Sequence, residues 1–241
     1  MSNWKFIWNN RKINDFNNTN SILGHLIEAD GFDSPTGKIN ESDWVNYLEY
    51  LKKYIKINNE ISLFEIGMGS GAFLYPFYLS KNKVGGIDFS EKLISVANKF
   101  MPDGDFCVGD ALDLNNKKKY DIVLSNSVFF YFKNLNYAEK VLELMYSKSN
   151  KKIAILDVND IKFKDIAELK RRGLLTPEDY DIKYKKNQHL YYDKSFFINF
   201  AKKVNSEIII FDQKINNYPA SGYRFNVIID KSKKFINKYK I

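Results

Sequence analysis

The chain has 241 residues, 44% of them hydrophobic and 27% charged, with a formal net charge of +8. This length and composition suit one α/β domain with additions. One cysteine and two histidines cannot form an internal disulfide or the usual zinc clusters, so we expect no metal site. No charged-then-apolar leader and no apolar run of membrane-spanning length is present, so we expect no membrane span and a cytoplasmic location.

The first 60 residues lack the alternation of a strand, and we expect them to form an N-terminal helical cap. A first helix would place four side chains on one side: Trp4, Ile7, Trp8 and Arg11. A turn-rich piece at residues 29–37 contains Asp33, and a second helix is expected from Ser42 to Ile55. If this cap folds over a ligand, it brings Trp8 to the ligand and Arg11 to a ligand carboxylate.

The stretch L-F-E-I-G-M-G-S-G-A-F-L, from Leu63 to Leu74, is the centre of the chain. A buried strand at residues 61–66 would end in three alternating glycines, followed by a helix at residues 72–79. These glycines are Gly67, Gly69 and Gly71. Glycine permits a sharp turn and the close approach of a ligand, and a helix start presents free N–H groups. The stretch therefore predicts a cofactor site at the carboxyl end of a strand.

From residue 61 onward, predicted strands and helices alternate, which indicates a parallel sheet. The expected strands are residues 61–66, 84–88, 105–108, 120–124, 152–156, 207–211 and 224–229. The expected helices after the glycines begin near residues 90, 136, 163 and 194. No repeat or linker marks a second domain, so we expect a single domain over residues 1–241. Its core would span residues 61–230, with an insertion at residues 158–192.

Two cofactors fit the glycine pattern. Gly67, Gly69 and Ala72 satisfy the dinucleotide pattern G-x-G-x-x-A, which alone is a weak signal. Glu65 separates the two readings, because an acid there repels a pyrophosphate and suits a cationic ligand. Glu65 with the three glycines resembles the first motif of class I S-adenosylmethionine-dependent methyltransferases, as does the order of elements over about residues 60–230. The resemblance implies a Rossmann-like seven-stranded α/β sheet whose last strand runs antiparallel.

The resemblance also implies the cofactor S-adenosyl-L-methionine, with S-adenosyl-L-homocysteine as product, bound at the carboxyl ends of the strands. Glu65 would lie beneath the amino group, Asp88 would accept bonds from the ribose hydroxyls, and Asp110 would accept from the adenine amino group. Alternatively, Asp110 only caps a helix and does not contact the cofactor. The full expected set is Trp8, Arg11, Glu65, Gly67, Gly69, Gly71, Asp88, Phe89, Asp110, Ala111, Ser125 and Asn126.

Other residues are candidates for the acceptor side. Tyr131 would border the reactive methyl, because aromatic faces attract cations such as a sulfonium. His189 and Asp160 are the candidate bases for a hydroxyl acceptor, whereas an anionic acceptor needs no base and would only be bound by them. The expected substrate-binding residues are Asp33, Tyr223 and Arg224. Arg224 would grip an anion or, alternatively, snorkel at a strand start.

Short motifs across the chain are similar to those of small-molecule methyltransferases encoded in bacterial capsule and surface-polysaccharide clusters. They are W-N-N-R, A-D-G-F-D-S, G-A-F-L-Y-P-F, G-G-I-D-F-S, H-L-Y-Y and S-G-Y-R-F-N-V-I. This resemblance implies a small polar acceptor, such as an oxygen of a sugar, a nucleotide sugar or a phosphate or phosphoramidate compound.

Three other functions stay open at this point. The net charge favours a nucleic-acid methyltransferase, but the lysines are scattered and the proline motif of base-amine enzymes is missing after the fourth strand. A nicotinamide-dependent oxidoreductase would bind its cofactor through Gly67, Gly69 and Ala72. The presence of Glu65 counts against this function. A protein that binds the cofactor without turnover is excluded by no residue.

Overall fold

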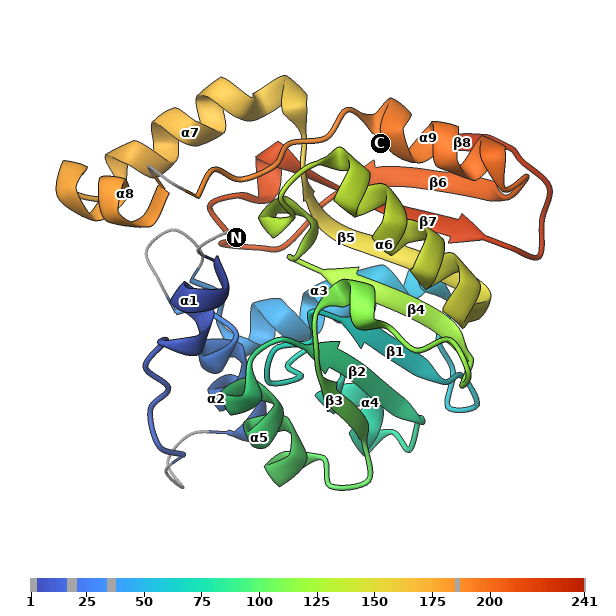
Figure 1. Ribbon diagram of the computed structural model, residues 1–241, viewed down its shortest axis with the longest axis horizontal. Coiled ribbons are helices and arrows are strands. Elements are labelled where there is room, and N and C mark those ends of the chain that lie inside the picture. Colours follow the sequence, from blue (N-terminus) through green and yellow to red (C-terminus); the bar gives the residue numbers. More distant parts are fainter. Residues whose placement is uncertain (1–3, 17–20, 34–37, 185–186, 241) are drawn as a thin grey trace.

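An apolar strand that ends in glycines, β1 (Leu63–Ile66), lies near the middle of an eight-stranded sheet in this computed structural model (Figure 1). The structure describes residues 4–16, 21–33, 38–184 and 187–240. The strand order is β3-β2-β1-β4-β5-β7-β6-β8. The other strands are β2 (Val84–Asp88), β3 (Asp105–Val108), β4 (Tyr120–Asn126), β5 (Ser149–Asn159), β6 (Glu207–Asp212), β7 (Arg224–Asp230) and β8 (Asn237–Lys240).

The direction of the strands agrees with the predicted fold. Strands β1 to β5 pair in parallel, and β7 runs antiparallel to both β5 and β6, between which it lies. The predicted count of seven strands is one too low, because β8 adds a parallel strand beyond β6. Its sequence, Asn-Lys-Tyr-Lys, has no apolar alternation, and the strand is defined only by its backbone pairing at the sheet edge.

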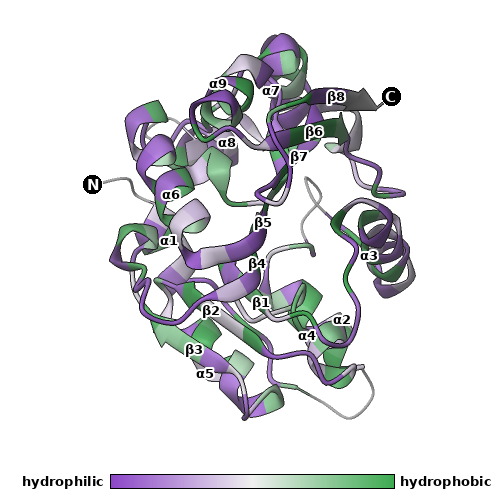
Figure 2. Cartoon of the chain, turned by 90° about the vertical axis from the view of Figure 1, so that its right-hand side faces the viewer, coloured by the Kyte–Doolittle hydropathy of each residue, from purple (hydrophilic) through white to green (hydrophobic). Residues whose placement is uncertain are grey.

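Helices cover both faces of the sheet, and Figure 2 shows α3 on one side and α6 on the other. The helices are α1 (Trp4–Asn9), α2 (Ile22–Ala29), α3 (Glu41–Ile55), α4 (Tyr75–Leu79), α5 (Glu91–Phe100), α6 (Leu135–Lys148), α7 (Lys164–Gly173), α8 (Pro177–Tyr184) and α9 (Lys194–Lys203). Short 3-10 helices are η1 (Ala111–Asp113), η2 (Phe129–Tyr131), η3 (Ile161–Phe163) and η4 (Ser221–Tyr223). Each face has its own apolar cluster, one including Trp44 and the other Phe197.

Local signals explain where several helices begin. Helices were predicted to begin near residues 90 and 194, and the side chains of Ser90 and Asp193 accept backbone N–H bonds at the starts of α5 and α9. The predicted helix at residues 72–79 is shorter than expected: residues 72–74 form a turn, and α4 starts at Tyr75. Helices α2 and α8 were not predicted.

A bulge in β5 reverses the alternation of its side chains. Ile153 and Ile155 pack in the cluster on the α6 side, and Val158 packs there too, although alternation would place it on the opposite face. The pairing of β5 with β7 shifts register between Ile155 and Val158, and Asp157 has a φ of 58°. This extra residue removes the Asp157 side chain from the regular faces of the sheet.

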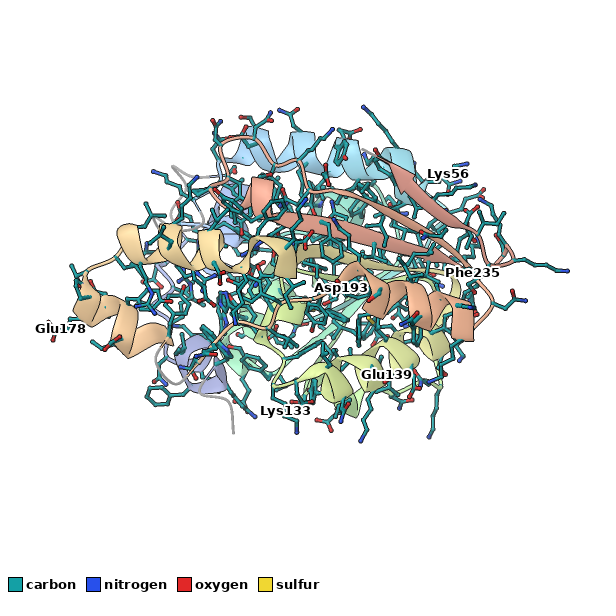
Figure 3. All side chains as sticks on the ribbon, turned by 90° about the horizontal axis from the view of Figure 1, so that it is seen from above. Lys56, Lys133, Glu139, Glu178, Asp193 and Phe235 are labelled. Atoms are coloured by element: carbon teal, nitrogen blue, oxygen red, sulfur yellow. The ribbon has the colours of Figure 1, made fainter. Side chains whose placement is uncertain are left out.

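The N-terminal cap meets the insertion at one end of the molecule. Figure 3 shows α8, marked by Glu178, at the end opposite Phe235. Trp4 of α1 packs against Tyr184 of α8, with ring centroids 6.0 Å apart, and joins Tyr180 in a third apolar cluster. Residues 34–37 of the predicted turn-rich piece, and residues 185 and 186 of the insertion, lie outside the described residues.

Candidate active site

A cavity of about 720 Å³ lies at the carboxyl ends of β1, β2, β3 and β4. Ten residues predicted to serve the site line it: Trp8, Glu65, Gly67, Gly69, Asp88, Phe89, Asp110, Ala111, Asn126 and Tyr131. They come from four strand ends and from the N-terminal cap, which explains how residues distant in sequence meet in one place.

Glu65 gives this cavity its chemical character. The residue is 2% exposed, and its Oε2 has no hydrogen-bond partner among the described residues. Burial, together with the nearby carboxyls of Asp30 and Asp88, raises the pKa of Glu65 well above its usual value. A buried, unsatisfied carboxyl oxygen facing a cavity fits a ligand that brings a positive charge, such as the amino group of S-adenosylmethionine.

Gly67 and Gly71 are glycines for different structural reasons. Gly67 has a φ of 70°, and a Cβ on it would lie 2.5 Å from the Val128 side chain. Gly71 also has a positive φ, but a Cβ there would overlap Met101, and Gly71 does not line the cavity. Its turn and its packing are sufficient reasons for a glycine at this position, and its predicted contact with the cofactor stays a prediction.

The two other acids at strand ends lie in the cavity wall. Asp88 accepts hydrogen bonds from the N–H groups of Gly69 (2.9 Å) and Ser90 (2.8 Å). Asp110 accepts from the Leu112 N–H at 3.0 Å and thereby caps η1, and it also accepts from the Tyr137 hydroxyl. Asp110 is thus both a helix cap and a cavity residue. Its proposed bond to adenine stays a prediction.

Two further residues predicted to bind the cofactor lie outside the large cavity. Arg11 donates to the carbonyls of Ala29 (3.1 Å) and Glu28 (2.9 Å) at the end of α2 and pairs with Asp33, so its guanidinium is engaged outside the large cavity. Ser125 is fully buried, and its hydroxyl donates to the Ile66 carbonyl at 2.9 Å. It joins β4 to β1 and does not line the cavity.

A second cavity, of about 370 Å³, adjoins the first. The two share wall residues, among them Trp4, Trp8, Asp30, Ser127 and Tyr131. Six residues predicted for the site line the second cavity: Trp8, Arg11, Asp33, Tyr131, His189 and Arg224. Two adjoining cavities with a common wall suit a reaction between two ligands.

Two residues predicted for the acceptor side lie outside both cavities. Asp160 caps η3 through the Lys162 N–H and pairs with Lys194 at 2.8 Å, away from both cavities. Tyr223 lines neither cavity; its ring lies 5.2 Å from the Lys170 ammonium and 6.0 Å from the Phe163 ring. Arg224, the next residue along the chain, does line the second cavity.

Arg224 is held by a buried polar network. It is 8% exposed and pairs with Asp157, and its NH1 also donates to the Tyr218 hydroxyl at 2.8 Å. Asp157 is fully buried and accepts from the Ser127 hydroxyl (2.6 Å) and the Gln213 amide (2.8 Å). The Nε and NH2 groups of Arg224 make no hydrogen bond within the described part of the chain, and the residue lines the second cavity.

His189 stands among aromatic rings. The centroids of Phe130, Trp4, Tyr184 and Tyr131 lie 4.8, 5.1, 5.3 and 5.4 Å from its own. In the H-L-Y-Y segment, the two tyrosines after Leu190 are buried. Burial also raises the pKa of the Tyr131 hydroxyl, which keeps it neutral at physiological pH.

Sequence reasoning missed the wall residues Trp4, Ser127, Arg171 and Tyr218 and the role of Asp30 in the wall. It also missed Asp157, which lines neither cavity but accepts from Ser127 and pairs with Arg224. Asp157 was visible in the D-V-N-D stretch after the fifth strand, and Asp30 in A-D-G-F-D-S. Their roles depend on contacts with distant residues. Among the described residues, no group of three or more His, Cys, Asp or Glu is placed to hold a metal. No helix in that same part of the chain has both the length and the hydropathy to cross a bilayer.

Comparison with known proteins agrees with this geometry. A family model described as a methyltransferase domain matches residues 64–165. Malonyl-(acyl-carrier protein) O-methyltransferase of Priestia megaterium is 30% identical over 89 residues, which cover 35% of this chain and 32% of that protein. The match thus spans about a third of the relative's length.

Solved structures resemble the whole fold. Magnesium protoporphyrin IX methyltransferase ChlM from Synechocystis PCC 6803 with bound SAM has a TM-score of 0.57 at 13% identity, covering 94% of this chain and 93% of its own. The plantazolicin methyltransferase BpumL, in complex with a monoazolic desmethylPZN analog and SAH, has a TM-score of 0.59 at 18% identity, covering 79% and 85%. The DhpI–SAM–HEP complex has a TM-score of 0.57 at 14% identity, covering 87% and 93%.

Residues 64–165 therefore match a methyltransferase domain, and the chain has the α/β fold of class I S-adenosylmethionine-dependent methyltransferases. Its methyltransferase domain takes S-adenosyl-L-methionine as cofactor, and the unsatisfied carboxyl of Glu65 fits that cationic ligand.

Proposed function

We propose that this protein transfers a methyl group from S-adenosylmethionine to an oxygen atom of a small, polar, anionic acceptor. The observation that carries the proposal is the second cavity, with the buried Arg224 guanidinium in its wall. Arg11 and Arg171 line the same cavity. A guanidinium with free donors binds carboxylate or phosphate oxygens by parallel hydrogen bonds.

Asp157 orients Arg224 for this role. Because Asp157 and the Tyr218 hydroxyl engage NH1, the remaining donors of the guanidinium are available on the cavity side. A guanidinium fixed in this way loses little conformational freedom when an anion binds. Arg11 is already paired with Asp33, and Arg171 donates to the Tyr191 hydroxyl at 2.9 Å. Arg224 is therefore the strongest candidate to hold the acceptor.

When bound, the cofactor supplies an electrophilic methyl group with a good leaving group, so the protein has mainly to align the acceptor. Tyr131 and Ser127 belong to both cavities and lie where the two ligands would meet. An anionic oxygen needs no base. For a hydroxyl acceptor, His189 is the base candidate in the wall of the second cavity.

The nature of the relatives supports this acceptor class. The curated relative is an O-methyltransferase by name, and the solved complexes hold a second ligand beside SAM or SAH. We extend the proposal to a sugar, nucleotide sugar or phosphate or phosphoramidate precursor of a surface polysaccharide, which rests on the sequence motifs described above. We expect the reaction to take place in the cytoplasm.

The test is release of S-adenosylhomocysteine against a panel of sugar phosphates, nucleotide sugars, phosphate and phosphoramidate compounds, neutral sugars, amines and RNA. We expect turnover with an anionic small molecule. With that acceptor, Arg224→Lys should raise KM by about tenfold, because it loses the forked geometry but keeps the charge. The exposed Lys234→Gln should not change KM. Turnover with RNA or neutral acceptors alone contradicts the proposal.

A further inference from the structure

The glycine-rich loop of the cofactor site is held from the N-terminal side by an acid at the end of α2. Asp30 is the C-terminal cap residue of α2 and lines both cavities. Its Oδ1 accepts from the Ser70 N–H at 2.5 Å, and its Oδ2 accepts from the Ala72 N–H at 3.1 Å. Asp30 therefore accepts hydrogen bonds from backbone N–H groups that were expected to be free for a ligand.

Other contacts fix the same junction. The Ser70 hydroxyl donates to the Leu26 carbonyl of α2 at 3.1 Å. Gly69 has a φ of 57°, and a Cβ on it would overlap Oδ1 of Asp30. Gly69 must be a glycine because of the Asp30 carboxyl as well as because of its backbone conformation. The shape of the loop thus depends on a residue about 40 positions upstream.

The charges around Asp30 need a cation. Asp88 from β2 and Glu65 from β1 line the large cavity together with Asp30, and none of the three acids has an ion pair in the described part of the chain. Arg11, the nearest guanidinium on the α1 side, is engaged with Asp33 and with the carbonyls at the end of α2. Burial, with a smaller contribution from the Asp88 carboxyl, raises the pKa of Asp30 to about 7, although the hydrogen bonds from Ser70 and Ala72 act to lower it.

We propose that Asp30 is a positioning residue of the cofactor site, which holds the glycine-rich loop in its binding shape and adds a third negative charge facing the cationic ligand. This inference rests on S-adenosylmethionine as cofactor and not on the identity of the acceptor. Binding of a cation favours the carboxylate form of nearby acids, so binding releases protons near neutral pH. Affinity then falls as the pH drops below about 7.

The experiment is calorimetric titration of the full chain with S-adenosylmethionine and S-adenosylhomocysteine at pH 6, 7 and 8. Asp30→Asn should weaken binding by about tenfold or more at pH 8, since it loses two charge-assisted hydrogen bonds, and should flatten the pH dependence. The matched control is Glu28→Gln on the exposed side of α2, which should bind as the wild type does. Hydrogen exchange at the Ser70 and Ala72 amides should be faster in Asp30→Asn.

A measurement on the wild type keeps the test valid if Asp30→Asn does not fold. Titration at pH 7 in two buffers of different ionisation enthalpy should show net proton release on binding. The role of Asp30 is overturned if Asp30→Asn binds like the wild type, or if the wild type binds without proton release. Either result leaves the proposed methyltransferase function in place. A wild type that binds neither ligand overturns both proposals.

Discussion

Replacing Asp157 by Asn tests whether the network beneath the second cavity is what we describe. The side chain of Asp157 is fully buried and accepts bonds from Ser127, Gln213 and Arg224. An Asn at this position keeps one acceptor oxygen but turns an N–H₂ group or a neutral oxygen toward the guanidinium. Arg224, which is 8% exposed, then has no compensating charge.

The expected loss is large because the remaining charge is buried. Removing one partner of a buried ion pair costs about 3–5 kcal/mol. For a domain of this size, 1 kcal/mol corresponds to a shift of about 2–4 °C in Tm, so Asp157→Asn should lower Tm by about 6–20 °C. The double variant Asp157→Asn/Arg224→Met should recover much of this loss, since it removes the uncompensated charge as well.

Thermal unfolding followed by circular dichroism at pH 7 measures both variants. The control is Glu143→Gln, which breaks an exposed pair with Lys203 (2.8 Å) and should leave Tm unchanged. If Asp157→Asn melts within about 2 °C of the wild type, less than the loss of a buried pair would give, Arg224 is not buried against Asp157 as described. A double variant less stable than Asp157→Asn would show that the two residues contribute independently.

Two further substitutions test the core and the loop. Burial lowers the pKa of His25 in the folded chain below its ordinary value of 6.5. As the pH falls below 6.5, His25 therefore binds a proton more readily in the unfolded chain, and the stability of the fold decreases. In urea unfolding at pH 7.5 and 5.5, His25→Phe should lose less stability between the two pH values than the wild type; an equal loss would contradict this. Gly67→Ala should weaken S-adenosylhomocysteine binding by about tenfold and cost about 1 kcal/mol or more, because of its positive φ and the contact with Val128. Gly173→Ala, which meets nothing within 4 Å, should do neither, and calorimetry that finds the two alike would refute the account of the loop.

Much of the fold was readable from the sequence because its signals are local. The run before Gly67, the cap at Ser90 and the cap at Asp193 lie next to the elements they define. Strand β3 was predicted with its observed bounds, Asp105–Val108. In contrast, α8 has little amphipathic character and β8 is a polar edge strand, so neither has a pattern to detect.

The site was predictable only where it follows strand ends. Glu65, Asp88 and Asp110 end up in one cavity because parallel strands present their carboxyl ends together. The contact between Asp30 and the loop, and the pairing of Arg224 with Asp157, join segments far apart in sequence. A bulge decides where Asp157 points, and no pattern in the sequence shows a single extra residue in a strand.

The third apolar cluster has a consequence for turnover. It joins α1 to α8 through Trp4, Tyr180 and Tyr184, and these side chains belong to neither cluster of the sheet. Separating the two helices exposes few apolar groups, so it costs much less free energy than unfolding the domain. Trp4 lines both cavities. We therefore expect exchange of spent cofactor for fresh cofactor to involve movement of these two short helices, while the sheet and the glycine-rich loop stay in place.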